Sequence, residues 1–213
     1  MKVPVIIQAR MSSRRFPGKV LTPLDGRPLL AHLLERLSKA RRAGGIVVAT
    51  SQERSDEAIR VYCRTNQIAC YAGPLENVAQ RFAEVIEHYA FQSFARVSGD
   101  SPLFNEGLLD EAIRLFQSNR YDIVTNIYER SYPKGQSVEV LRAEVFLKNV
   151  PKMKDASEEE HPTLYFYKNA AAFKIYNMKN PEGDRSKENW CVDTPGDLER
   201  IESLLTKAKA VAS

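Results

Sequence analysis

The chain is poor in the residues that mark secreted, metal-clustered or membrane-spanning proteins. Only 3 of its 213 residues are cysteine (Cys63, Cys70 and Cys191), and their scattered spacing fits neither a zinc site nor a disulfide framework. No apolar run approaches the roughly 18 residues that a membrane helix needs. Polar Gln8 directly follows the first apolar run, which disfavours a secretory signal. These absences predict a reduced cytoplasmic protein.

The chain also lacks a large charge of either sign. It has 31 basic and 27 acidic residues, a net charge of +4, which is too small to indicate nucleic-acid binding by itself. Aromatic residues are not interleaved with its most basic segment, as platforms for base stacking would be. With 43% hydrophobic residues the chain can form one substantial core, so disorder is disfavoured.

Short apolar runs alternate with helical patterns along the first two-thirds of the chain. Strands are predicted at 3–9, 45–50, 68–71, 94–98, 121–127, 137–141 and 173–178. Helices are predicted at 29–37, 55–66, 78–89 and 109–116, and from Pro195 on, with a stripe of Leu198, Ile201, Leu204 and Leu205. This order predicts an α/β fold, a mostly parallel sheet with helices on both faces. Ligands of such sheets bind at the carboxyl ends of the strands.

The later part of the chain has a less regular pattern. Residues 155–160 form an acidic stretch that we expect to be irregular, and a polar loop spans 177–189. We interpret about 128–190 as a small inserted lobe or dimerisation arm, since it is too short for a core of its own. The prediction is therefore one domain over residues 1–213.

The segment from Gln8 to Lys19 is the most informative. It directly follows the first predicted strand and carries four cations, two serines and one glycine, but no acid. The net positive charge of the whole chain is therefore concentrated here. Backbone N–H groups and cations in such a loop can hold phosphate. The spacings of a Walker A loop and of a dinucleotide-binding glycine loop are both missing, and a solvated basic loop is the alternative.

This segment resembles a known signature. Arg10-x-x-Ser13-x-Arg15-Phe16-Pro17-Gly18-Lys19 is similar to the N-terminal motif of cytidylyltransferases that activate acidic sugars, namely CMP-KDO synthetases and acylneuraminate cytidylyltransferases. Its opening, from Gln8 to Ser13, resembles still more closely the spore coat polysaccharide biosynthesis protein F family of that superfamily. The resemblance recurs in order at 99–103, 135–140, 160–163 and 192–199.

The resemblance implies a Rossmann-like nucleotidyltransferase fold, CTP as substrate, Mg²⁺ and a homodimer. It implies that Asp100 and Asp193 are the metal ligands, in line with the preference of Mg²⁺ for carboxylate oxygen. Arg10, Lys19 and Asp100 are the implied catalytic residues. The implied nucleotide-binding residues are Ala9, Arg10, Ser12, Ser13, Arg15, Lys19 and Ser98.

Structural roles could account for several of these residues. Asp100 is also a common turn residue before Ser-Pro. Thr194 and Pro195 are typical of a helix start, with Asp197 as the partner in a capping box, so we assign Asp197 to structure and leave Asp193 for chemistry. Arg81 could face the nucleotide or sugar, although a salt-bridged surface position is the interpretation we favour.

Other positions concern the sugar side. His161 lies in a motif that we associate with the substrate, with an irregular acidic loop as the alternative. Lys134 and Ser137 stand where the resembling families carry acids, and these departures put the identity of the sugar in question. No order of residues typical of covalent nucleophilic catalysis is present.

The sequence therefore predicts a cytidylyltransferase that transfers CMP from CTP to an acidic sugar, in surface polysaccharide biosynthesis, with release of pyrophosphate. Two alternatives stay open. One is a catalytically degenerate nucleotide-binding partner in the same pathway. The other is a nucleotide-sugar glycosyltransferase, which the missing Asp-x-Asp motif disfavours.

Overall fold

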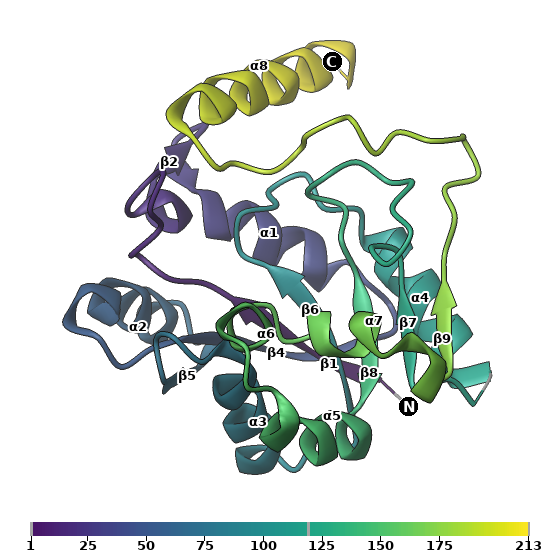
Figure 1. Cartoon of the computed structure of the whole chain (residues 1–213). Coiled ribbons are helices and arrows are strands. Elements are labelled where there is room, and N and C mark those ends of the chain that lie inside the picture. Colours follow the sequence, from purple (N-terminus) through teal and green to yellow (C-terminus); the bar gives the residue numbers. More distant parts are fainter. Residues whose placement is uncertain (1, 119, 213) are drawn as a thin grey trace.

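The computed structural model describes residues 2–118 and 120–212, with the side chains of the last helix described up to residue 206. A seven-stranded sheet in the order β5-β4-β1-β6-β8-β7-β9 forms its centre (Figure 1). Its strands are β1 (Val3–Gln8), β4 (Ala43–Ser51), β5 (Ala69–Gly73), β6 (Ser93–Ser98), β7 (Ile123–Thr125), β8 (Glu139–Arg142) and β9 (Ile175–Asn177). Strand β8 runs antiparallel to both its neighbours, and every other pair in this sheet is parallel. The predicted mostly parallel sheet is confirmed.

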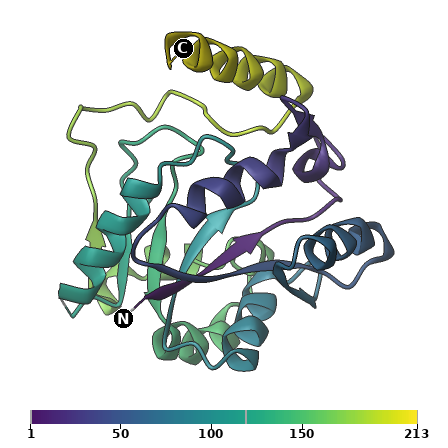
Figure 2. The same ribbon diagram turned by 180° about the vertical axis from the view of Figure 1, so that it is seen from behind.

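Helices cover both faces of the sheet, as the two opposite views show (Figures 1 and 2). Successive strand residues point to opposite faces, so Val5 and Ile7 of β1 join one core cluster and Ile6 joins the other. The first cluster includes α1 (Leu29–Ser38), α2 (Glu57–Thr65) and α4 (Glu106–Ser118). The second includes α3 (Val78–His88), α5 (Ala143–Asn149) and α7 (Leu164–Lys168).

Smaller elements surround this core. A two-stranded ribbon of β2 (Pro23–Leu24) and β3 (Arg27–Pro28) packs near α8 (Pro195–Ala212), which lies at the edge of the molecule. Of the expected apolar stripe on α8, Ile201 is buried and Leu198 and Leu205 pack beside it, but Leu204 is exposed. Single 3-10 turns occur at Lys19–Leu21, Arg54–Asp56, Val150–Lys152 and Ala170–Ala172.

Two expectations about the later part of the chain need correction. The stretch expected to be irregular contains a short helix, α6 (Ala156–Glu160), whose N-cap Asp155 accepts a hydrogen bond from the backbone N–H of Ser157 at 2.8 Å. Strands β8 and β9 lie within residues 128–190 yet belong to the central sheet. This part of the chain is therefore built into the main layer, because the buried Val140 and Leu141 of β8 join the core clusters on the two faces of the sheet.

The carboxyl ends of β1, β4 and β6 meet at one edge of the sheet, since the three strands are parallel neighbours. Gly99 follows β6 at this edge, and its N–H donates to the Gln8 carbonyl at 2.9 Å. A Cβ at position 99 would stand 2.9 Å from that same oxygen. Glycine thus lets the segments that follow β1 and β6 approach each other closely.

Candidate functional site

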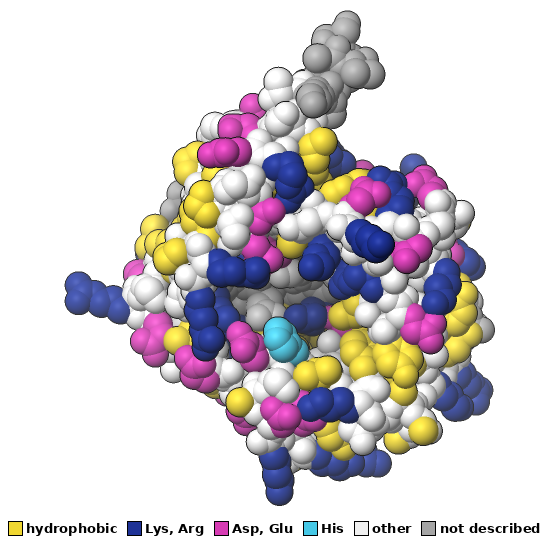
Figure 3. Space-filling model, turned by 45° about the horizontal axis from the view of Figure 1, so that its top comes forward, with side chains coloured by type: hydrophobic (Ala, Val, Ile, Leu, Met, Phe, Trp, Pro, Cys, Tyr) yellow, Lys and Arg dark blue, Asp and Glu magenta, His cyan; other side chains and the backbone are white. Residues whose placement is uncertain are grey.

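A cleft of about 250 Å³ lies at this edge, and a hollow bordered by Lys and Arg side chains is visible on the face shown in Figure 3. The loop after β1 forms one wall. The structure brings most of the sequence-predicted residues together there, and those lining the cleft are Ala9, Arg10, Ser13, Arg15, Lys19, Ser98, Asp100 and Asp193. Ser12 is exposed and does not line the cleft.

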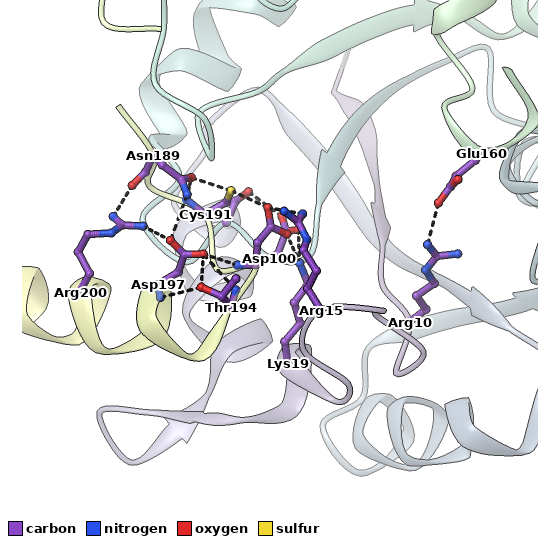
Figure 4. A network of polar contacts seen from close by, with 12 residues as sticks. Arg10, Arg15, Lys19, Asp100, Glu160, Asn189, Cys191, Thr194, Asp197 and Arg200 are labelled. Carbon is purple, nitrogen blue, oxygen red and sulfur yellow. Dashed lines mark hydrogen bonds and ion pairs between the residues drawn. The ribbon is translucent and has the colours of Figure 1, made fainter. Parts of the chain in front are cut away.

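Lys19 is at the centre of the site. Its side chain is only 9% exposed, and its ammonium donates to Asp100 Oδ2 at 2.7 Å and to Asp193 Oδ1 at 2.8 Å. The other oxygen of Asp193 pairs with Arg15 at 2.8 Å, and the Arg15 side chain is 67% exposed (Figure 4). Two carboxylates that are 93 positions apart in the sequence thus hold one nitrogen.

Asp193 reaches the site because the segment before α8 is tied to the loop after β6. The N–H of Val192 donates to the Asp100 carbonyl at 2.9 Å. Directly after Asp193, the Thr194 hydroxyl and the Asp197 carboxylate exchange hydrogen bonds with each other's backbone N–H groups, as a capping box requires. The structural role predicted for Asp197 is confirmed, and the helix start fixes the position of Asp193.

The charges of the cluster determine the pKa values of its members. Burial alone would lower the pKa of Lys19, but the charge of Asp100 and the hydrogen bonds to both carboxylates outweigh it and raise that pKa. Burial would raise the pKa of Asp193, yet Lys19 and Arg15 lower it overall. The pKa of the nearby Cys191 thiol rises to about 12 because of burial and the two acids. At neutral pH Lys19 is therefore an ammonium and Asp193 a carboxylate, with a neutral Cys191 thiol beside them.

Arg10 lies on the other side of the cleft, where its guanidinium pairs with Glu160 at 2.9 Å (Figure 4). The hydrogen bond from Arg10 lowers the pKa of Glu160. The neighbouring His161 lines both this cleft and the adjoining cavity. The segment at the end of α6, 150 positions from Arg10, thus closes the cleft opposite the Lys19 cluster.

Asp56 is a residue of the site region that the sequence did not reveal. It is completely buried, and its carboxylate accepts hydrogen bonds from the Met11 N–H at 2.7 Å and from the Ser51 N–H at 3.0 Å and hydroxyl. These bonds tie the basic loop to the end of β4. An acid in the first turn after a strand would have been a weak signal, because such residues are common at helix starts.

The position of Arg81 differs from the one predicted from the sequence. It is fully buried, where a salt-bridged surface position was favoured. One guanidinium nitrogen, Nη1, donates to the Pro74 carbonyl at 2.7 Å, whereas Nε and Nη2 are buried with no hydrogen-bond partner in the described part of the chain. Burial, followed by the charge of Arg10, lowers the pKa of Arg81 to about 10. The charges of Asp56 and Glu84 offset part of this lowering.

A second cavity of about 280 Å³ adjoins the cleft and shares Arg96, Ser98 and His161 with it. Glu139 of β8 lies in its wall, is 1% exposed and pairs with Arg96. The Tyr167 hydroxyl donates to the other Glu139 oxygen at 2.5 Å, and burial together with that acid raises the pKa of Tyr167. Ser137 also lines this cavity, whereas Lys134 is exposed and lines neither hollow.

The described part of the chain shows neither a clustered metal centre nor a membrane-spanning helix. Among residues 2–118 and 120–212, no group of three or more His, Cys, Asp or Glu side chains is placed to bind a metal ion. Two carboxylates sharing one cation are still a suitable donor set for Mg²⁺, which takes one or two carboxylates beside substrate oxygens. No helix in the described part of the chain is long and apolar enough to cross a bilayer.

The sheet order and the cationic cleft at the strand ends define a Rossmann-like nucleotidyltransferase fold. A family model described as cytidylyltransferase matches residues 4–212. The chain therefore belongs to the cytidylyltransferase family, as the sequence motifs predicted.

Individual relatives agree with this assignment. The spore coat polysaccharide biosynthesis protein SpsF of Bacillus subtilis is 32% identical over 212 residues, which cover 95% of this chain and 86% of SpsF. The 3-deoxy-manno-octulosonate cytidylyltransferase of Geobacter metallireducens is 37% identical over 113 residues, 53% of this chain and 44% of that enzyme. A solved cytidylyltransferase from Leptospira borgpetersenii superposes with a TM-score of 0.92 at 30% identity, over 97% of this chain and 87% of that one.

Proposed function

We propose that the chain transfers CMP from CTP to an acidic sugar and releases pyrophosphate, as a step in surface polysaccharide biosynthesis. The observation that carries this proposal is the Lys19 ammonium held by Asp100 and Asp193 in a cleft that also contains Arg10 and Arg15. Cations and paired carboxylates at the carboxyl ends of parallel strands are what a triphosphate with its metal requires. The names of SpsF and of the octulosonate cytidylyltransferase support the sugar and the pathway.

In this proposal the loop after β1 binds the triphosphate. Arg15 is two-thirds exposed and can turn toward a ligand, while Lys19 is held in the floor of the cleft. Ala9, Ser13 and Ser98 line the cleft, where the Ser13 N–H group and Ser98 would contact the nucleotide, whereas the Ala9 N–H already donates to the Ala49 carbonyl at 3.2 Å. Arg10 would exchange its ion pair with Glu160 for one with a phosphate oxygen. A guanidinium forms strong paired hydrogen bonds with phosphate as well as with carboxylate.

Asp100 and Asp193 are the residues that would hold Mg²⁺. When bound, Mg²⁺ would neutralise phosphate charge and act as a Lewis acid. The protein then orients the sugar hydroxyl in line with the α-phosphorus. The sugar oxygen forms a bond to the α-phosphorus as the bond to the β-phosphate breaks, pyrophosphate leaves, and the hydroxyl proton passes to water. Positioning and charge neutralisation therefore supply most of the catalysis.

We also propose that the protein acts as a homodimer, as the family resemblance implies. Its test is the molar mass in solution, measured by light scattering at several protein concentrations. A monomer at all concentrations, with full activity, would contradict it.

Pyrophosphate release from CTP with a panel of ulosonic acids tests the activity directly. We expect CTP- and acceptor-dependent release by the wild-type protein and the loss of about 10²-fold or more in rate for Asp100→Asn. Asp184→Asn is the matched control, because Asp184 is an exposed acid outside the cleft. A folded protein that releases no pyrophosphate with any nucleotide and acceptor pair would refute the proposed reaction.

A further inference from the structure

The second cavity, beside the proposed CTP cleft, has an excess of positive charge. Its wall contains two guanidinium groups, those of Arg96 and Arg130, but only one carboxylate, that of Glu139. Both oxygens of Glu139 are already engaged, one by Arg96 and the other by the Tyr167 hydroxyl. Within the described residues, no ion pair joins Glu139 to the second guanidinium, that of Arg130.

Arg130 is the second guanidinium of this cavity, and the charge of Glu139 reaches it without a direct ion pair. Its Nη2 donates to the Ser137 hydroxyl at 3.0 Å and its Nη1 lies 3.5 Å from the Pro133 carbonyl, and it forms no ion pair within the described residues. The side chain is partly buried, and this burial lowers the pKa of Arg130. An arginine still carries its charge at neutral pH, and a partly buried charge without a partner is costly. A bound anion would offset that cost.

We infer that Arg130 binds an anionic oxygen group of the acceptor, a carboxylate or a phosphate, and so selects charged acceptors over neutral ones. The inference rests on the proposed function, because it takes the cavity next to the CTP cleft as the acceptor site. A planar guanidinium binds either group through two parallel hydrogen bonds. The one polar side chain that already contacts Arg130, Ser137, is neutral and leaves its charge free.

Arg130→Met tests this assignment directly, because it removes the guanidinium and leaves the Ser137 hydroxyl in place. Lys134→Met is the matched control, since it removes an exposed cation only four positions from Arg130 that lines neither hollow.

The experiment measures binding by calorimetry in the presence of a CTP analogue with a methylene bridge between the α- and β-phosphorus atoms. One pair of probes is 3-deoxy-manno-octulosonic acid and its neutral carboxamide. The other pair is mannose 1-phosphate and mannose. The pair that shows a charge preference identifies the anionic group as a carboxylate or a phosphate.

We expect the wild-type protein and Lys134→Met to bind one charged probe about 30-fold or more tightly than its neutral partner. This ratio is typical of the affinity lost when one member of a desolvated charged pair is removed. In Arg130→Met this ratio should fall to about threefold or less. Binding of neither charged probe, equal binding of charged and neutral probes, or a ratio unchanged in Arg130→Met would overturn the inference.

The result separates the two proposals. CMP transfer to a neutral acceptor, unaffected by Arg130→Met, would overturn the role of Arg130 and leave the nucleotidyl transfer standing. Arg130-dependent binding of a charged probe without any pyrophosphate release from CTP would have the opposite meaning. It would support the anion site and refute the proposed reaction.

Discussion

Replacing Asp56 by asparagine would break the attachment of the basic loop to the sheet. The completely buried carboxylate accepts the Met11 N–H on Oδ1, and the Ser51 N–H and hydroxyl on Oδ2. An asparagine offers one acceptor oxygen, and its NH₂ group would face a donor. At least one of the two backbone N–H groups therefore loses its partner in Asp56→Asn.

The expected loss of stability follows from the hydrogen bonds that Asp56→Asn removes. A hydrogen bond to a charged group contributes about 1.5–3 kcal/mol, and a buried donor left without a partner costs about 1–3 kcal/mol. Since these two effects overlap, we expect Asp56→Asn to lower the free energy of unfolding by roughly 2–4 kcal/mol. With a urea slope of about 2–3 kcal/mol/M, the unfolding midpoint should fall by about 1–2 M.

Equilibrium urea unfolding at pH 7, followed by circular dichroism, measures this change. Asp110→Asn is the control, because Asp110 also accepts two backbone N–H groups, of Arg41 at 2.9 Å and Arg42 at 2.7 Å, but at the surface. Water can replace those bonds, so the control should lose no more than about 1 kcal/mol. A loss below about 1 kcal/mol for Asp56→Asn, or one equal to the control, would refute the reasoning.

Three further predictions concern the same region. Lys19→Met should lower the free energy of unfolding most between about pH 4 and pH 10. The lowered pKa of Asp193 stabilises the fold above the pKa of an unfolded aspartate, and the raised pKa of Lys19 stabilises it below the pKa of an unfolded lysine. Chemical unfolding across this pH range measures the difference from wild type, and a difference that does not change with pH would contradict the prediction. Asp193→Asn should lose about 10²-fold or more of CTP-dependent pyrophosphate release while its circular dichroism spectrum stays that of the folded protein; retained activity would argue against a metal ligand. Gly135→Ala should lower the free energy of unfolding by about 2 kcal/mol or more, since φ is +87° and a Cβ would stand 2.6 Å from the Trp190 backbone. Gly183→Ala, at φ +95° with open space around it, should lower it by only about 1–2 kcal/mol. Equal urea midpoints for the two variants would show that the close contact at position 135 is relieved.

Patterns confined to a few neighbouring residues were predicted well. The capping box of Thr194 and Asp197 depends on groups three residues apart, and it forms as expected. Strand β1 and helix α1 likewise follow from apolar spacing that each segment carries by itself. The irregular structure expected for residues 155–160 was wrong, because the N-cap Asp155 and a first turn rich in acids suffice for a short helix.

The burial of Arg81 could not be predicted in this way. A helical pattern shows which face is apolar, but it does not show that the loop at Pro74 folds over the guanidinium and excludes water from it. The carbonyl of Pro74 comes from the turn before α3, and its direction depends on how that turn packs.

By itself, the sequence determined the alternation of strands and helices, the concentration of positive charge after β1, and the motifs of the cytidylyltransferase family. Only the tertiary structure decided that Asp100 and Asp193 hold the same ammonium, that Glu160 pairs with Arg10 across 150 positions, and that Arg130 forms no ion pair within the described residues. The reason is physical. Periodicity and capping are properties of a local segment, whereas an ion pair between distant residues exists only after the sheet has aligned the ends of its strands and excluded water from between them.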